Sequence, residues 1–158
     1  MNKAETELTV FPPSSIEDFL SLCTGQWMAL CSSFELSKSE DNWHNSERSM
    51  MTIQLSSLDG KFKQVVLNTT SNTATTRYFS LDGHFTSEDS SFGQWIFRTD
   101  GSLELIWRNP LRDEEEHERI WFTKPNLRLC SKITLNPDCT LLEAKFHSEI
   151  RRLNQGII

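Results

Sequence analysis

The stretch at residues 115–133, EEHERIWFTKPNLRLCSKI, decides the fold because it reads as two β-strands joined by a short turn. Two largely apolar runs, IWF and LRL, flank the turn sequence TKPN at residues 123–126, and proline and asparagine are typical of such turns. Each strand also carries a charge, Glu118 in the first and Arg128 in the second. A charge that faces the interior of a barrel is costly unless a partner compensates it, so these two side chains are candidates for a functional site.

The alternation of side chains along a strand does not decide whether these two charges point to the inside or the outside of the sheet. Glu118 shares its strand face with Ile120, and Arg128 shares its strand face with Lys132. One interpretation is a cross-strand ion pair on the outside of the sheet, worth about 0.2–1 kcal/mol. The other is an internal site in which both charges meet a ligand of complementary charge.

The rest of the chain is rich in short β-type segments joined by turns, among them the DG dipeptides at residues 59–60, 82–83 and 100–101. The expected strands are residues 27–36, 49–58, 62–70, 73–80, 94–98, 102–107, 117–122, 127–133 and 140–152. Strands and helices do not alternate, so a parallel sheet is not expected. The pattern predicts an all-β fold, an up-and-down antiparallel barrel of about eight to ten strands. A barrel of that size is either filled by side chains or holds one small ligand. The acidic run at residues 113–116 is interpreted as a solvated hairpin tip.

One short helix is expected before the first strand. The sequence SSIE at residues 14–17 is a capping-box pattern, in which a serine caps free backbone amides. Apolar residues follow at helical spacing, at positions 16, 19, 20 and 23, and Gly25 suits the end of the helix. Residues 1–13 are interpreted as a flexible N-terminal tail and residues 14–158 as a single domain.

The composition limits the classes of partner. The chain has 158 residues with five tryptophans, enough for one domain with a sizeable core. A net charge of −6 argues against nucleic acid as the main partner, and the lack of a long apolar window argues against membrane insertion. The four cysteines have no C-x-x-C spacing and are interpreted as reduced, buried thiols of a cytosolic protein. The four histidines lack metal-ligand spacing, so no metal is expected.

The GQW sequence at residues 25–27 lies between the expected helix and the first strand. It resembles the G-x-W element of lipocalins and other calycins, in which the tryptophan closes the floor of a barrel. In such barrels an arginine near the end of the last strand often lies across the indole. Arg151 or Arg152 is expected to take this place through a cation–π contact.

A more specific resemblance covers three blocks of the chain. ERIWFTKPNLRL at residues 118–129 is similar to the "ERxWFxxPNLRxR" block of the S-type (CpcS/CpeS) phycobiliprotein lyases. FHSEIR at residues 146–151 resembles the closing "F-x-S-E-I-R" of that family, and residues 18–27 resemble its "FF…GxW" start. The blocks follow in the family's order, so the chain is identified by resemblance as a member of this family.

The resemblance implies a calycin-type barrel that binds a linear tetrapyrrole, a bilin such as phycocyanobilin or phycoerythrobilin. It also implies that the protein promotes thioether attachment of the bilin to a cysteine of an apo-phycobiliprotein subunit. Glu118 and Arg128 are then the catalytic candidates, the glutamate at the pyrrole nitrogens and the arginine at a propionate. Bilin contacts are implied for Asp82, Trp121, Glu149 and Arg151. Members of this family are often homo- or heterodimers, and the expected location is the cyanobacterial cytoplasm or the plastid stroma.

Several alternatives remain open. Cys130 stands where the family has a second arginine, and Cys31 stands where it often has a basic residue. These differences favour a non-catalytic bilin carrier, or the partner subunit of a heterodimeric lyase, as the second interpretation. A third is a calycin carrier of fatty acid or another apolar ligand. Trp121 is alternatively a core residue, and the two cysteines are either ordinary buried thiols or covalent attachment points.

Overall fold

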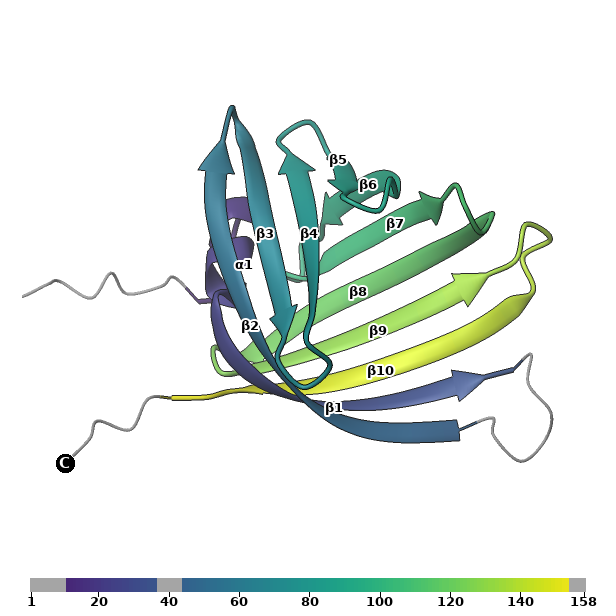
Figure 1. The fold of residues 1–158 in the computed structure, drawn as a ribbon. Helices are drawn as coiled ribbons and strands as arrows, with labels where there is room; N and C mark the ends of the chain where they lie inside the picture. Colours follow the sequence, from purple (N-terminus) through teal and green to yellow (C-terminus); the bar gives the residue numbers. More distant parts are fainter. Residues whose placement is uncertain (1–10, 37–43, 154–158) are drawn as a thin grey trace, which may run out of the picture.

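Ten antiparallel strands close into a barrel in the computed structural model, which describes residues 11–36 and 44–153 (Figure 1). Within these ranges there is one helix, α1 (Ile16–Cys23), which precedes the strands. The strands are β1 (Gly25–Glu35), β2 (His44–Leu58), β3 (Lys61–Asn68), β4 (Thr73–Ser80), β5 (His84–Ser87), β6 (Phe92–Phe97), β7 (Leu103–Asn109), β8 (Glu114–Lys124), β9 (Leu127–Leu135) and β10 (Leu141–Arg151). Each strand pairs with the next one in the chain, and β1 pairs with β10 to close the barrel. The predicted fold class, an up-and-down barrel with one short N-terminal helix, is confirmed.

Helix α1 begins and ends close to its sequence signals. Ser15 is the N-cap residue, and its hydroxyl accepts a hydrogen bond of 3.1 Å from the backbone N–H of Asp18. Phe19 on the apolar face is fully buried. Gly25 follows the helix with a φ of 136°, a conformation that side chains rarely adopt. A Cβ at Gly25 would also lie 2.7 Å from Nη1 of Arg151, so both the backbone and the available space favour glycine here.

The predicted flexible tail at residues 1–13 falls mostly outside the described residues, because residues 1–10 are not part of them. Pro13 is described, and it is buried. The carbonyl of Pro13 lies 3.5 Å from the position that a Cβ would take at Gly101 in the β6–β7 turn. Pro13 therefore packs against the barrel.

Some observed strands differ from the predicted ones only in their bounds, as β2 does, which begins at His44 and not at residue 49. Two differences concern more than a bound. The pattern does not predict β5, whose four residues, HFTS, are too few to show alternation. The acidic run at residues 113–116 is not simply a hairpin tip, because the turn occupies residues 110–113 and β8 begins at Glu114. Glu116 in that strand lies with its Oε1 3.6 Å from Nζ of Lys132 and 3.3 Å from Oγ1 of Thr134.

Helix α1 lies at one end of the barrel (Figure 1), and aromatic side chains pack together at that end. The ring of Phe19 meets the rings of Phe122 and Phe97 edge-on, with centroids 5.2 Å and 6.2 Å apart. Trp27 is 0% exposed, and its Nε1–H donates a hydrogen bond of 2.8 Å to the carbonyl of Cys23. The predicted role of Trp27 in closing the floor of the barrel is confirmed, since a buried indole needs both apolar contact and a partner for its N–H.

Arg151 completes this closed end. Its guanidinium carbon lies 4.3 Å from the ring centroid of Trp27, which is a cation–π distance. The same guanidinium donates hydrogen bonds to the carbonyls of Leu22 and Thr24 and to Oδ1 of Asn126. Of the two arginines expected for this position, the structure selects Arg151, which ties the end of β10 to the end of α1.

Candidate functional site: the barrel cavity

The two charges of the 115–133 hairpin point into the barrel. In the β8–β9 register Glu118 is opposite Lys132 and Phe122 is opposite Arg128, so Glu118 and Arg128 lie on the same sheet face. Glu118 is 8% exposed and Arg128 is 7% exposed, and both line a cavity of about 430 Å³. The alternative of an ion pair on the outside of the sheet is therefore wrong.

Side chains of β1–β4 and β8–β10 line this cavity and carry most of its charge. Its cations are Arg77, Arg128, Lys132 and Lys145, and its carboxylates are Glu47, Glu118 and Glu149. The cavity thus has more cations than carboxylates, although the whole chain has a net charge of −6. Two further carboxylates, Glu116 and Glu143, lie 3.6 Å from Lys132 and 3.1 Å from Lys145, so these two cations are paired as well.

Glu118 is held by one cation and one thiol. Its Oε2 lies 3.3 Å from Nη2 of Arg77, which reaches it from β4. Its Oε1 accepts a hydrogen bond of 3.3 Å from the thiol of Cys130 on the neighbouring strand. The guanidinium of Arg77 lies over two aromatic rings, 5.7 Å from the centroid of Phe85 and 5.4 Å from that of Trp107. These contacts fix Arg77 beside the carboxylate.

The protonation state of Glu118 follows from these neighbours. Burial by itself raises the pKa of Glu118, but the charges of Arg77 and Lys132 outweigh burial, so the pKa lies below its ordinary value. Glu118 is therefore an ionised carboxylate at neutral pH. Burial and the negative charge of Glu118 both raise the pKa of Cys130 well above its usual range, so Cys130 remains a thiol that donates to the carboxylate.

Arg128 forms the most buried ion pair that lines the cavity. Its Nε donates to Oε2 of Glu149 on β10, and the two side chains are 8% and 4% exposed. Its guanidinium also lies 5.4 Å from the ring centroid of Trp27. Burial by itself lowers the pKa of Arg128, yet the adjacent carboxylate of Glu149 outweighs burial and raises that pKa. The pair sits directly above the closed floor of the barrel.

A row of polar side chains crosses the wall next to this ion pair. The register places Cys31 of β1 opposite His147 of β10, and His147 opposite Cys130 of β9. Nε2 of His147 lies 3.4 Å from Sγ of Cys31, and Nδ1 of His147 lies 3.9 Å from Oε1 of Glu149. Burial lowers the pKa of His147 and outweighs the opposing effect of Glu149, so the imidazole is neutral at neutral pH.

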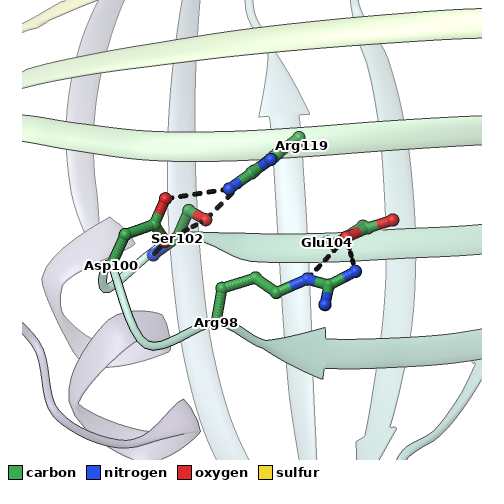
Figure 2. Close-up of polar contacts among 5 residues, drawn as sticks. All are labelled: Arg98, Asp100, Ser102, Glu104 and Arg119. Carbon is green, nitrogen blue, oxygen red and sulfur yellow. Dashed lines mark hydrogen bonds and ion pairs between the residues drawn. The ribbon is translucent and has the colours of Figure 1, made fainter.

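Three of the residues for which ligand contacts were predicted do not line this cavity. Trp121 alternates with Ile120, which faces the lumen, and Trp121 instead lies under Arg119, whose guanidinium carbon is 5.0 Å from the indole centroid. Arg119 donates hydrogen bonds of 2.8 Å to Asp100 and 3.1 Å to Ser102. Figure 2 shows these contacts beside the β6–β7 turn. Trp121 is therefore neither a wall of the cavity nor part of the buried core.

The other two residues are Asp82, which lies in a turn, and Arg151, which lies at the closed end of the barrel. Asp82 is in the turn between β4 and β5, where its carboxylate, 65% exposed, lies 2.9 Å from Nδ1 of His84. That hydrogen bond lowers the pKa of Asp82. Arg151 binds the floor of the barrel, as described above. Of the predicted site residues, the structure thus brings together Glu118, Arg128 and Glu149.

Arg77, Lys132 and His147 are cavity residues that sequence reasoning did not select. A signal existed for Arg77, because it is the one charged residue in the strand sequence TATTRYFS at 73–80. Its alternation with Phe79, a core residue 1% exposed, places it on the inner face. A lone arginine on the core-facing side of a strand is a candidate for a buried ion pair.

A second hollow, of about 470 Å³, lies outside the lumen between residues 12–14 and the β6–β7 turn. We place the functional site in the lumen, because the buried charges gather there. Among residues 11–36 and 44–153, no group of histidine, cysteine and acidic side chains is arranged to hold a metal ion. No helix in that part of the chain is long and apolar enough to cross a membrane.

All four cysteines are free, in agreement with the expected reduced thiols. Cys23 and Cys130 are buried as expected, and Cys31 is half-buried. Cys139 is exposed, because it lies in the turn between β9 and β10.

Comparison with known proteins gives relatives of both sequence and fold. No protein-family model matches the sequence. A curated protein of Paulinella chromatophora, chromophore lyase CpcS/CpeS 1, is 45% identical over 148 residues, which are 93% of this chain and 94% of that protein.

Two solved structures share the fold. The S-type phycobiliprotein lyase CPES from Guillardia theta superposes with a TM-score of 0.65 at 17% identity, over 90% of this chain and 95% of that one. A protein of unknown function of the DUF3598 family from Nostoc punctiforme superposes with a TM-score of 0.64 at 16% identity, over 94% of this chain and 53% of that one. Because the Paulinella relative matches nearly the whole sequence at 45% identity, this chain belongs to the CpcS/CpeS chromophore lyase family.

Proposed function

We propose that this protein is a phycobiliprotein lyase, which binds a bilin in the barrel cavity and promotes its attachment to a client protein. The bond formed is a thioether between the bilin and a cysteine of an apo-phycobiliprotein subunit. Family membership and the shared fold support this function. The observation that carries the proposal for this chain is a cavity of about 430 Å³ with an ionised carboxylate, Glu118, and a guanidinium, Arg128, buried within it.

The cavity matches the chemistry of a bilin in size and in charge. Its volume lies within the range of about 300–1,000 Å³ that is typical of small-molecule sites. A bilin has two carboxylates, four pyrrole-type nitrogens and a long conjugated apolar body. Arginine suits a propionate because its planar fork donates two parallel hydrogen bonds. The bond from Arg128 to Glu149 uses the donor at Nε, which is one of the five that arginine carries.

Glu118 is proposed to activate the bilin. An ionised carboxylate beside the pyrrole N–H groups stabilises the protonated, cationic form of the tetrapyrrole. Protonation withdraws electrons from the exocyclic ethylidene double bond, so a thiol adds to that bond more readily. Arg77 and Cys130 hold the carboxylate in place for this task, since they bind its two oxygens.

The nucleophile of the transfer is proposed to be the cysteine of the client. A free thiol is only a few per cent thiolate at neutral pH, so the lyase contributes most by positioning and activating the electrophile. Phycocyanobilin and phycoerythrobilin both have the required double bond, and both are candidate substrates. The corresponding location is where phycobiliproteins mature, the cyanobacterial cytoplasm or the plastid stroma. Pairing with a second copy or a related chain is part of the same proposal, because the family resemblance implies it.

One observation favours a second function, that of a bilin carrier or the non-catalytic partner of a heterodimeric lyase. Cys130 occupies the position at which the family resemblance places a second arginine. In the structure it donates a hydrogen bond to Glu118 and contributes no positive charge to the cavity.

The test is a two-step assay with both bilins. The protein is mixed with phycocyanobilin or phycoerythrobilin and the shift of the absorption band is recorded; apo-subunit is then added, and coloured product that survives denaturation is measured. A shift followed by transfer is expected. A shift without transfer would instead support the carrier, and no shift with either bilin would favour a carrier of an apolar ligand.

A further inference from the structure

The thiol of Cys31 stands in the cavity with the geometry of a nucleophile. Cys31 and His147 are directly opposite each other in the β1–β10 register, and both line the cavity (Figure 1 shows β1 and β10 side by side). Sγ of Cys31 is 3.4 Å from Nε2 of His147. Nδ1 of His147 faces Oε1 of Glu149 at 3.9 Å. This order of thiol, imidazole and carboxylate is the arrangement by which a histidine activates a nucleophile and an acid orients the histidine.

From this geometry we propose that Cys31 is a covalent attachment site of this chain itself, at which a bilin bound in the cavity forms a thioether with the lyase. The inference rests on the proposed function, because it requires a bilin in the cavity. It differs from that function in the acceptor, which is a residue of this chain and not a cysteine of the client.

The step balances without an oxidant or a reductant. The S–H of Cys31 adds across the ethylidene double bond: an S–C bond forms at the exocyclic carbon, and the π bond breaks. The thiol proton passes to Nε2 of His147 and from there to the ring carbon of the same double bond. The reverse elimination returns the thiol and the free double bond, so the adduct holds the bilin without consuming it.

The protonation states of the two residues agree with this role. Burial raises the pKa of the Cys31 thiol, so Cys31 is not a thiolate on its own and needs a base. Burial lowers the pKa of His147, so the imidazole is neutral and able to accept the proton. With its proton on Nδ1, the nitrogen that faces Glu149 at 3.9 Å, the imidazole leaves the lone pair of Nε2 for the thiol.

The other cysteines are worse placed for this reaction. Cys130 is buried, and its thiol donates to Glu118. Cys23 is 1% exposed and lies in α1 at the closed end. Cys139 is exposed in a turn and does not line the cavity, so it serves as a matched control for non-specific reaction of a thiol.

The experiment uses the full chain and phycocyanobilin, with two readouts on the same sample. Absorption of the native mixture reports binding in the cavity, and the mass of the denatured chain reports a covalent adduct. The native protein and C139S should both gain the mass of one bilin, on the peptide that contains Cys31. C31S should still shift the absorption of the bilin on binding, but it should lack the change to shorter wavelength that loss of the conjugated double bond causes, and it should lose the adduct. Far-ultraviolet circular dichroism confirms that each variant is folded.

The variant His147→Gln tests whether His147 acts as a general base or only occupies space beside Cys31. Glutamine keeps a polar side chain at the position but does not accept the proton. The rate of adduct formation should fall about 10²-fold, which is the low end of what a general base contributes. Burial lowers the pKa of His147, so in the native protein this rate should hold through the ordinary histidine value of about 6.5 and fall only at a lower pH, where the imidazole becomes protonated; H147Q should lack this fall. The charged and titratable groups that face His147 are Lys145, Glu149, Cys31, Glu47, Glu118, Arg128, Cys130 and Lys132.

The outcomes separate this inference from the proposed function. A native absorption shift without any denaturation-resistant adduct, or with an adduct on another residue, would overturn the assignment of Cys31 and leave bilin binding intact. If no absorption shift occurs, bilin binding itself fails and the Cys31 adduct fails with it. An adduct that survives in C31S but is lost in C139S would show that exposed-thiol chemistry is the source.

Discussion

Replacing Arg128 with methionine should cause a large loss of stability, because it leaves a buried carboxylate without its cation. The side chains of Arg128 and Glu149 are only 8% and 4% exposed, so water does not replace the lost partner. Breaking a buried ion pair from one side costs about 3–5 kcal/mol. With a urea m-value of about 2 kcal/mol/M, the unfolding midpoint should fall by about 1.5–2.5 M.

Two further variants make this prediction specific. R128M/E149L removes both charges and should recover most of the lost stability, because an apolar pair of similar volume often replaces a buried ion pair without cost. Arg108→Met is the matched control: Arg108 pairs with Glu115 at 3.5 Å, but these side chains are 58% and 30% exposed. Its loss should cost about 0.2–1 kcal/mol.

The measurement is urea unfolding, followed by tryptophan fluorescence, of five proteins: the native chain, R128M, E149L, R128M/E149L and R108M. The double-mutant cycle built from R128M, E149L and the combined variant isolates the coupling between the two charges. A loss below about 1 kcal/mol in R128M would refute the reasoning, since that is the range of an exposed pair. Equal and additive losses in the cycle would refute it as well, because they would show that the two charges do not depend on each other.

Four other outcomes are expected. Glu118→Gln should slow bilin transfer about 10²-fold, whereas Glu115→Gln, on the outer face of β8 beside Arg108, should leave transfer unchanged. Equal rates in E118Q and the native protein would exclude the activating role. Folding lowers the pKa of Glu118, so the ionised carboxylate contributes its full stabilisation above the ordinary value of 4.5. That stabilisation is lost as the pH falls through the lower pKa of the folded state. Urea midpoints measured down to pH 3 should therefore decline less steeply in E118Q than in the native protein. Arg151→Ala should lower the free energy of unfolding by about 2–3 kcal/mol, or Tm by about 5–10 °C in calorimetry. Arg152→Ala, at an exposed position, should change Tm little. Similar shifts in both variants would contradict the role of Arg151 in joining β10 to α1. Trp121→Phe should leave the absorption band of bound bilin unchanged, and a displaced band would place this outer residue in the site after all.

The site also explains how a barrel keeps several charges in its interior. Every cation that lines the cavity lies within 4 Å of a carboxylate, and the two arginines also lie over aromatic rings. A bilin with two propionates would therefore not meet free cations, but would share cations that the protein already positions. This arrangement gives each of these charges a partner and fixes the direction of each donor before a ligand binds.

The sequence by itself determined the architecture and the family of this protein. The turn signals and the strand alternation are local properties of the backbone, so they predicted an up-and-down barrel, and the capping serine and Gly25 predicted the helix and its end. The short strand β5 was missed because four residues cannot show a period. The blocks at residues 118–129 and 146–151 were sufficient to select Glu118, Arg128 and Glu149.

Only the tertiary structure decided which charges meet. Alternation states that side chains share a strand face, but it does not state which face is inside until β1 pairs with β10 and the barrel closes. Arg77 and Glu118 are 41 residues apart and lie on strands that are not neighbours in the sheet, so no local spacing predicts their contact across the lumen. The same closure turns Trp121 outward and places Cys31 against His147, because the register of each strand is fixed by all the others around the ring.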